Sequence, residues 1–317
     1  MTGSSAPRGL IVDLVTPLDK NKNIDTQSLE GLLDRVLAYS QAIFLASPHT
    51  GEGNLLTKEQ LKILLGHTLS VVETAKPILF WISRKSEEET REVLFGLAEA
   101  VEKRGLKGLV FWVDTPLSYR SNRGLLNYYR ELCSQSGQSF LLYNDPDFVQ
   151  RRRVRNRPLK RGNIRTSILK EMVSLEGIKG MIFRGTLERA HNYQKAVINR
   201  ADFMTYDGDE ARFLKHPSLS GVVSAGANLA PEAWQRITTS SMSVEESDHR
   251  YPDQVRQILE TGDYVLRLHE VYAHNPAPLI KEALHRLGVI RGNTSLQELR
   301  EPSRTVEQLL ELVGGRV

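Results

Sequence analysis

Short apolar runs alternate with longer amphipathic runs along most of the chain. Strands of this kind, separated by helices, pair in parallel through crossover connections, so the pattern predicts a closed (β/α)8 TIM barrel. A doubly wound sheet is the alternative. The apolar runs interpreted as buried strands are GLIVDLVTPL (9–18), AIFLAS (42–47), KPILFWI (76–82), GLVFWV (108–113), SFLLYN (139–144), GIKGMIF (177–183), DFMTYDG (202–208) and GVVSAG (221–226).

Helix starts can be recognised between these runs. The segments 57–60 (TKEQ) and 86–89 (SEEE) both fit the capping box, in which a hydroxyl and the residue three positions later satisfy free backbone amides. After residue 230 the strand pattern stops, while helical pattern continues. We therefore predict a barrel catalytic domain over residues 1–230 and a C-terminal helical segment, residues 231–317, packed on the barrel.

Composition narrows the class of protein. The chain has 317 residues, of which 40% are hydrophobic and 25% charged, so it can form a sizeable core. No apolar stretch is long enough to span a membrane, and the N-terminus does not resemble a signal peptide. The single cysteine, Cys133, lies in a helical stretch and is interpreted as a structural thiol with no metal-ligand companion. These features predict a cytoplasmic protein without a metal site.

A lysine stands inside the sixth apolar run. Strand alternation puts Lys179 on one face with Met181 and Phe183. Burial favours the neutral amine and lowers its pKa, which an amine needs in order to attack a ketone and form an imine. Alternatively, Lys179 sits at a strand end and reaches solvent or a carboxylate. The pattern alone leaves both readings open.

The ends of other strands carry groups that suit imine chemistry. The second strand runs into SPHTGEG (47–53), a turn able to bind a carboxylate, and the fifth runs into YNDPDF (143–148), which begins with a tyrosine. The eighth runs into SAGAN, whose small residues leave room. In a barrel these ends meet at one face. An amine, a phenol and an anion-binding turn together indicate a site for a 2-oxo acid.

Several segments resemble the dihydrodipicolinate synthase and N-acetylneuraminate lyase family of class I aldolases. The resemblance implies a TIM barrel, usually tetrameric, that forms a Schiff base with pyruvate or another 2-oxo acid. It implies that Lys179 is the imine-forming lysine, Tyr143 the proton shuttle and Thr50 a carboxylate ligand. The segments that carry it are LVTPLDKNKNIDTQSLEGLLD, HTGEGNLLTKEQ, YNDP, GIKG, YDGDEARFL, GVVSAGANLAPEAW and NPAPLIKEAL.

The same resemblance extends the site to residues expected to bind substrate. These are His49, Gly51, Tyr119, Gly208 and Ser224. No cofactor is expected beyond the lysine itself. The expected partners are a small 2-oxo acid and an aldehyde, with no nucleic acid and no membrane, in a homo-oligomer that is a dimer or tetramer.

The chain also departs from the family pattern. Pro48 and His49 replace small residues of the turn, and the first hydroxyl of the synthase proton relay is lost with them, so His49 either serves the relay or leaves it broken. Phe148 stands where the synthases have an arginine for the second substrate. An arginine-rich run, 150–165, is read as a solvated surface loop, with a basic lid over an anionic substrate as the alternative.

These observations predict a lyase that makes or cleaves an aldol-type carbon–carbon bond, with a 2-keto-3-deoxy sugar acid as one possible substrate. Two alternatives stay open at this point. One is dihydrodipicolinate synthase activity itself, which the loss of the arginine disfavours. The other is a non-catalytic member of the family that binds a small metabolite.

Overall fold

The computed structural model describes residues 5–72, 76–151, 162–242, 251–299 and 303–314. Eight parallel strands close into a barrel in the order β1 to β8, and β1 pairs with β8. The predicted TIM barrel is confirmed. The strands are β1 (Gly9–Asp13), β2 (Ala42–Leu45), β3 (Ile78–Trp81), β4 (Val110–Asp114), β5 (Ser139–Asn144), β6 (Ile178–Phe183), β7 (Met204–Asp207) and β8 (Gly221–Ser224).

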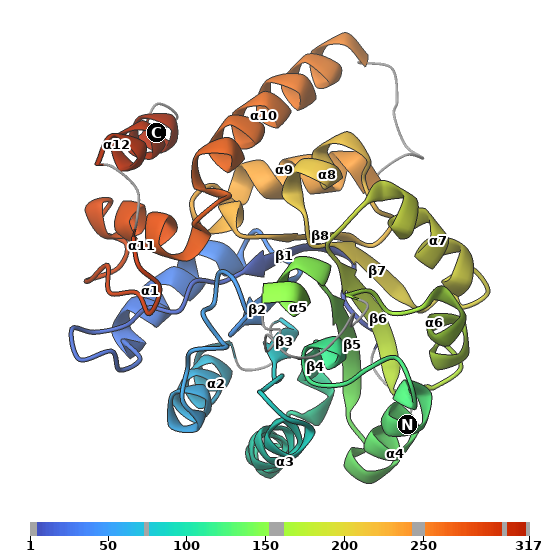
Figure 1. Ribbon diagram of the computed structural model, residues 1–317. Helices are drawn as coiled ribbons and strands as arrows, with labels where there is room; N and C mark the ends of the chain where they lie inside the picture. The colour runs from blue at the N-terminus through green and yellow to red at the C-terminus, as the bar shows by residue number, and fades with distance from the viewer. Residues whose placement is uncertain (1–4, 73–75, 152–161, 243–250, 300–302, 315–317) are drawn as a thin grey trace.

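Helices surround the barrel, and α10 to α12 extend to one side of the ring (Figure 1). The short α5 lies across the barrel in that view. The helices are α1 (Thr26–Leu37), α2 (Lys58–Val72), α3 (Glu87–Lys103), α4 (Leu125–Ser136), α5 (Pro146–Arg151), α6 (Thr166–Met172), α7 (Leu187–Val197), α8 (Glu210–Lys215), α9 (Pro231–Met242), α10 (Tyr251–Tyr272), α11 (Pro276–Arg286) and α12 (Ser303–Gly314). Single 3-10 turns are η1 (Lys107–Leu109), η2 (Pro116–Ser118) and η3 (Gly226–Asn228).

Side chains divide between two apolar clusters because successive strand residues point to opposite faces. The barrel interior contains Ile11, Phe44, Trp81, Leu141 and other inward-facing residues. The larger cluster fills the space between strands and helices. Since both faces of each strand are covered, the strands read as nearly continuous apolar runs, which is why they could be recognised in the sequence.

The predicted capping box forms completely at residues 57–60 and in part at 86–89, where Glu89 binds the amide of Lys85 instead of that of Ser86. The Gln60 amide donates to Thr57 Oγ1 at 3.2 Å, and the Thr57 amide donates to Gln60 Oε1 at 2.7 Å. At the next helix, the Glu89 amide donates to Ser86 Oγ at 3.2 Å, while the Glu89 carboxylate accepts from the Lys85 amide. Each box satisfies amides that a helix start leaves free.

The C-terminal helices pack against the barrel and each other. Helix α9 contacts β1 and β8, α10 contacts α9, and α12 contacts α10 and α11. The predicted division at residue 230 falls directly before α9. Most of the arginine-rich run, residues 152–161, lies outside the described residues. Within the described part of the chain, no helix has the length and apolarity needed to cross a membrane.

Candidate active site

Three polar side chains gather at the carboxyl end of the barrel. Asp13 ends β1, Tyr143 is next to last in β5, and Arg184 directly follows β6. Ile11 and Ile182 lie two residues before Asp13 and Arg184 and belong to the interior cluster together with Tyr143. By strand alternation, all three polar groups therefore face the barrel axis. This is the end at which TIM barrels carry their reactive groups.

Arg184 is a cation of this site. Its Nη1 donates to the Gly208 carbonyl at 2.6 Å, its Nε lies 3.4 Å from Asp145 Oδ2, and it is hydrogen-bonded to Tyr143. Burial alone would lower the pKa of the guanidinium, but the neighbouring Tyr143 and Asp145 raise it above its ordinary value. With 39% of its side chain exposed, Arg184 is a permanent positive charge that a ligand can reach.

Gly208 makes room for this arginine. A Cβ at position 208 would lie 2.8 Å from Arg184 Cγ and 3.1 Å from Ile182 Cγ2. Its own amide donates to the Phe183 carbonyl at 2.9 Å. The predicted substrate-binding residue Gly208 thus lies at the site, where it supports Arg184 through its backbone.

Asp13 is a buried carboxyl in the same site. Ser47 and Thr50 are hydrogen-bonded to it, while its Oδ1 has no hydrogen-bond partner among the residues that the structure describes. Burial raises the pKa of Asp13 to about 7, although Ser47, Thr50 and the Arg184 charge oppose the shift. Near neutral pH this carboxyl can therefore both give and take a proton.

The turn after β2 is tightly built. The Gly51 amide donates to Ser47 Oγ at 2.9 Å, and Thr16 Oγ1 donates to the Gly51 carbonyl at 2.8 Å. A Cβ on Gly51 would meet the Ser47 nitrogen at 2.5 Å, so only glycine fits. Thr50 is buried against Asp13. The predicted site residues Thr50 and Gly51 therefore lie at the carboxyl end of the barrel.

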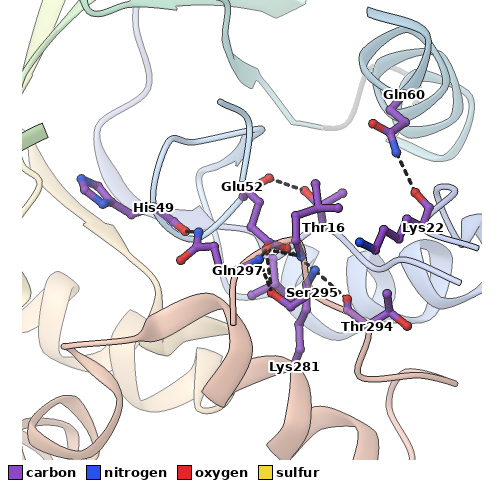
Figure 2. Close-up of polar contacts among 12 residues, drawn as sticks. Thr16, Lys22, His49, Glu52, Gln60, Lys281, Thr294, Ser295 and Gln297 are labelled. Atoms are coloured by element: carbon purple, nitrogen blue, oxygen red, sulfur yellow. Dashed lines mark hydrogen bonds and ion pairs between the residues drawn. The ribbon is translucent and has the colours of Figure 1, made fainter. Parts of the chain in front are cut away.

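Glu52 fixes this turn to the C-terminal segment (Figure 2). Glu52 and Lys281 of α11 form an ion pair in which both side chains are fully buried. The other oxygen, Oε1, accepts from Ser295 Oγ and from the amides of Leu296 and Gln297 at 2.6–2.8 Å. Residues more than 200 positions apart in sequence thereby set the position of the turn.

His49 reaches across the site to Asp145. Its Nε2 lies 2.7 Å from Asp145 Oδ2, and its ring packs edge to face on Phe148 at 5.8 Å. Burial lowers the pKa of His49, so at neutral pH we assign a neutral ring that donates from Nε2. Burial alone would raise the pKa of Asp145, but the hydrogen bond from His49 and the charge of Arg184 lower it.

Phe148 closes part of the carboxyl end. It comes from α5, belongs to the interior cluster and packs edge to face on Trp81 at 5.8 Å. Asp145 starts α5 by accepting from the Phe148 amide at 2.9 Å. Phe148, at the position of the synthase arginine, therefore covers part of the site with an apolar ring. Its backbone is bound by Asp145, which also binds His49.

Ser224 is engaged in a second polar cluster beside the site. Its Oγ donates to Glu210 Oε1 at 2.5 Å, and the other carboxylate oxygen is bound by Tyr272 at 2.7 Å and by His269 Nδ1 at 2.9 Å. Burial raises the pKa of Glu210, but His269, Ser224 and the Gly226 amide outweigh this and lower it. Ser224 thus helps to tie α10 to the barrel through Glu210.

Tyr119, predicted to bind substrate, is engaged in a separate polar cluster. Its hydroxyl donates to Asp114 Oδ2 at 2.7 Å and lies 3.1 Å from the hydroxyl of Tyr128. Asp114 also accepts from Tyr129. Phe111 and Val113 face the interior, so Asp114 points to the helix layer and takes Tyr119 with it.

The prediction that Lys179 reaches Tyr143 and the Thr50 turn is wrong. Lys179 is the second residue of β6, whereas the partner of Tyr143 in the sheet register is Ile182. At ~3.3 Å per residue, Lys179 lies about 10 Å short of that level. Its charge acts instead on Asp202, in the connection that enters β7 from the amino end of the barrel. Lys179 is half-buried at the strand end, which is the alternative that the pattern left open.

A register irregularity at the start of β6 accounts in part for the position of Lys179. The pairing shifts between Phe140 and Leu141, opposite Lys179. Ile178, Met181 and Phe183 all belong to the outer cluster, so the alternation expected from Ile178 onward does not hold through the irregularity.

Sequence analysis did not identify Arg184, Asp13 or Asp145 as site residues. One signal was available for the first two. Asp13 is a charged residue at the end of an apolar run, and Arg184 is the first residue after one. Because β6 runs to Phe183, the carboxyl end of the strand carries the arginine, five residues after the lysine.

An acid, a phenol and a fixed cation at the carboxyl end of a TIM barrel define a site for acid–base chemistry on an anionic carbon compound. Residues 6–311 match the model of the Dihydrodipicolinate synthetase family. The chain therefore belongs to this family, whose characterised members are lyases of the class I aldolase type, which form Schiff bases. The predicted family and fold and the broader class, a lyase family, are confirmed.

Relatives and solved structures agree with this assignment. The 4-hydroxy-tetrahydrodipicolinate synthase of Sodalis glossinidius is 28% identical and that of Shewanella pealeana 26%, with alignments covering 96% and 95% of this chain and 98% and 95% of theirs. The dihydrodipicolinate synthase of Acinetobacter baumannii, solved with pyruvate, has the same fold, with a TM-score of 0.78 at 20% identity, covering 98% of this chain and 99% of that chain.

Proposed function

We propose that the carboxyl end of the barrel binds a small 2-oxo acid, with pyruvate as the first candidate, and makes or breaks a carbon–carbon bond next to its carbonyl. Arg184 provides the positive charge for the anion. The observation that carries this proposal is the position of Arg184, inward-facing, solvent-accessible and surrounded by Tyr143, Asp145 and Asp13.

The chemistry differs from an imine mechanism at Lys179. A guanidinium stays protonated in proteins and does not act as an amine nucleophile. It does bind carboxylates and developing oxyanions well, through charged hydrogen bonds in fixed geometry. We propose that the negative charge that forms at the carbonyl oxygen is stabilised by Arg184 rather than drawn into an imine. No cofactor enters this scheme.

Family membership supports a 2-oxo acid as the ligand class. The Acinetobacter baumannii relative was solved as a complex with pyruvate. Phe148 in place of an arginine disfavours dihydrodipicolinate synthase activity itself, because an apolar ring packed on Trp81 offers nothing to a second carboxylate. A 2-keto-3-deoxy sugar acid, whose aldehyde half is uncharged, fits this cover better.

The first test is ligand binding. Calorimetry and saturation-transfer NMR with pyruvate and a panel of 2-oxo acids should detect binding to the native protein. Arg184→Met should weaken it by about 100-fold, because a hydrogen bond to a charged group contributes ~1.5–3 kcal/mol. The matched control is Lys179→Met, which removes the other cation of the same strand and should leave binding unchanged.

The second test concerns the imine. Borohydride treatment with pyruvate, followed by intact mass measurement, should give no adduct on the native protein. Arg184→Lys places an amine at the carboxyl end of β6 and should acquire a pyruvyl adduct on residue 184. An adduct on Lys179 in the native protein, or loss of binding in Lys179→Met but not in Arg184→Met, would contradict the proposal.

A second candidate function is metabolite binding without turnover. It is favoured by the commitment of Thr50 to Asp13 and of Ser224 to Glu210, which leaves fewer free hydroxyls at the carboxyl end. Turnover assays with sugar-acid and semialdehyde partners separate the two functions.

The expected homo-oligomer stays a prediction, and light scattering would measure the oligomeric state. One structure of the same fold is a monomeric synthase variant. It is 22% identical, with a TM-score of 0.79, and the match covers 98% of this chain and 96% of that chain.

A further inference from the structure

We propose that Asp13 is the base that removes the proton next to the carbonyl of the bound 2-oxo acid, and that Arg184 stabilises the resulting enolate. This inference rests on the proposed function, since it needs a 2-oxo acid bound at Arg184. It assigns the proton transfer to a strand that carried none of the residues predicted for the site.

The position of Asp13 supports this role. It is the last residue of β1 and faces the barrel axis, as Arg184 does at the end of β6, three strands away around the closed barrel. The charge of Arg184 acts on Asp13, so the two groups share one electrostatic environment. Because both groups face the same axis, the carboxylate can act on the carbon that loses its proton while the cation stabilises the oxygen that becomes negative.

One oxygen of Asp13 is left for a ligand. Ser47 and Thr50 hold the carboxyl, but Oδ1 is buried without a hydrogen-bond partner in the described part of the chain. Buried polar atoms without partners are rare, because they lose hydrogen bonds to water without replacing them. A bound substrate that presents a proton to Oδ1 would supply the missing hydrogen bond.

The proton affinity of Asp13 suits the reaction. Burial and Glu210 raise its pKa, while Ser47, Thr50 and Arg184 lower it, and the balance is near neutrality. Tyr143 faces the same space, but burial raises its pKa well above the ordinary value, so its phenolate is scarce near pH 7. Asp13 is therefore the better base of the two.

The Asp13 carboxylate takes a proton from the carbon next to the carbonyl, and the pair of electrons from that C–H bond becomes a carbon–carbon double bond. The carbonyl π pair moves onto oxygen, where Arg184 stabilises the negative charge. In D2O the Asp13 carboxyl exchanges its proton with solvent and returns a deuteron to the carbon, so the substrate becomes labelled without being consumed.

The experiment is exchange of the pyruvate methyl protons in D2O, followed by proton NMR, with binding measured in parallel on the same samples. The native protein should accelerate exchange over buffer. Asp13→Asn keeps the shape and the hydrogen bonds to Ser47 and Thr50 but lacks the base, so exchange should fall by about 100-fold or more while affinity changes by less than about threefold. Asp202→Asn, at the amino end, is the control and should exchange normally.

Each other outcome overturns the inference in a recognisable way. Pyruvate that binds without exchanging in the native protein removes the enolisation but leaves the proposed binding function intact. Exchange that survives in Asp13→Asn but is lost in Tyr143→Phe assigns the proton to the phenol. If no 2-oxo acid binds at all, the proposed function fails first and the inference with it.

Discussion

The two ends of the barrel treat charge differently. At the carboxyl end, Asp13, Asp145 and the Glu52–Lys281 pair are buried and bound to several partners each. At the amino end, Arg200 and Asp202 pair at 3.1 Å with the aspartate 56% exposed, and Lys179 is half-buried nearby. Both ends contain cations, but the buried carboxylates Asp13, Asp145 and Glu52 lie at the carboxyl end, whereas Asp202 at the amino end is largely exposed.

The difference shows at which end of the barrel the fold keeps charged groups buried although their desolvation is unfavourable. Desolvating a charge is unfavourable, so buried charges persist only where partners compensate for it or where chemistry uses them. A pair with an exposed partner, such as Arg200 with the 56% exposed Asp202, contributes little in either direction. A charged residue in an apolar strand therefore indicates function only when it lies at the end of the barrel where such partners are assembled.

The largest expected effect is on stability. Glu52→Gln leaves the fully buried Lys281 without its counter-charge and should lower the free energy of unfolding by about 3–5 kcal/mol. Urea denaturation followed by circular dichroism measures it. The matched change at the amino end, Asp202→Asn, should cost less than about 1 kcal/mol. Equal losses in the two variants would abolish the contrast between the ends.

The next effect depends on pH. The pKa of Asp13 is raised to about 7 in the folded protein, so ionisation of this group favours the unfolded chain as pH rises from about 4 to 7. Asp13→Asn lacks this penalty. Its stability relative to the native protein should increase by about 2–3 kcal/mol between pH 5 and pH 8. Denaturation curves at the two pH values test this, and a difference independent of pH would show that Asp13 ionises normally.

A smaller effect is expected at Gly208. A Cβ there would lie 2.8 Å from Arg184 Cγ and would move the guanidinium, so Gly208→Ala should weaken 2-oxo acid binding by about tenfold, equivalent to ~1.4 kcal/mol. Calorimetry measures the affinity. Gly96→Ala on the exposed face of α3, where a Cβ meets nothing within 4 Å, is the control and should bind normally. Normal binding by Gly208→Ala would mean that Arg184 does not set affinity.

The smallest expected effect is that of a substitution at Lys179. Lys179→Met should leave ligand affinity and proton exchange within about twofold of the native protein, since the charge of Lys179 acts on Asp202 and Lys179 lies about 10 Å below the level of Tyr143. Calorimetry measures the affinity, and proton NMR in D2O measures the exchange. A large loss of either would return Lys179 to the mechanism and break the comparison between the ends.

The sequence by itself determined the barrel, its helix starts and several parts of the site. Apolar runs buried on both faces and capping residues are local signals, and they gave the strands and the capping boxes. Tyr143 and the Thr50 turn could be placed because one lies in the last part of a recognisable strand and the other follows shortly after the end of another. Family membership also followed from ordered segments along the chain.

Tertiary structure alone decided which charged residues meet. The order of residues does not show how far along β6 a side chain lies relative to its neighbours, and the register irregularity opposite Lys179 is a property of the sheet. Only the closed barrel brings Asp13 of the first strand near Arg184 after the sixth. The pKa of Asp13 depends on the same closure, because desolvation and coupling between charges act through space and not along the chain.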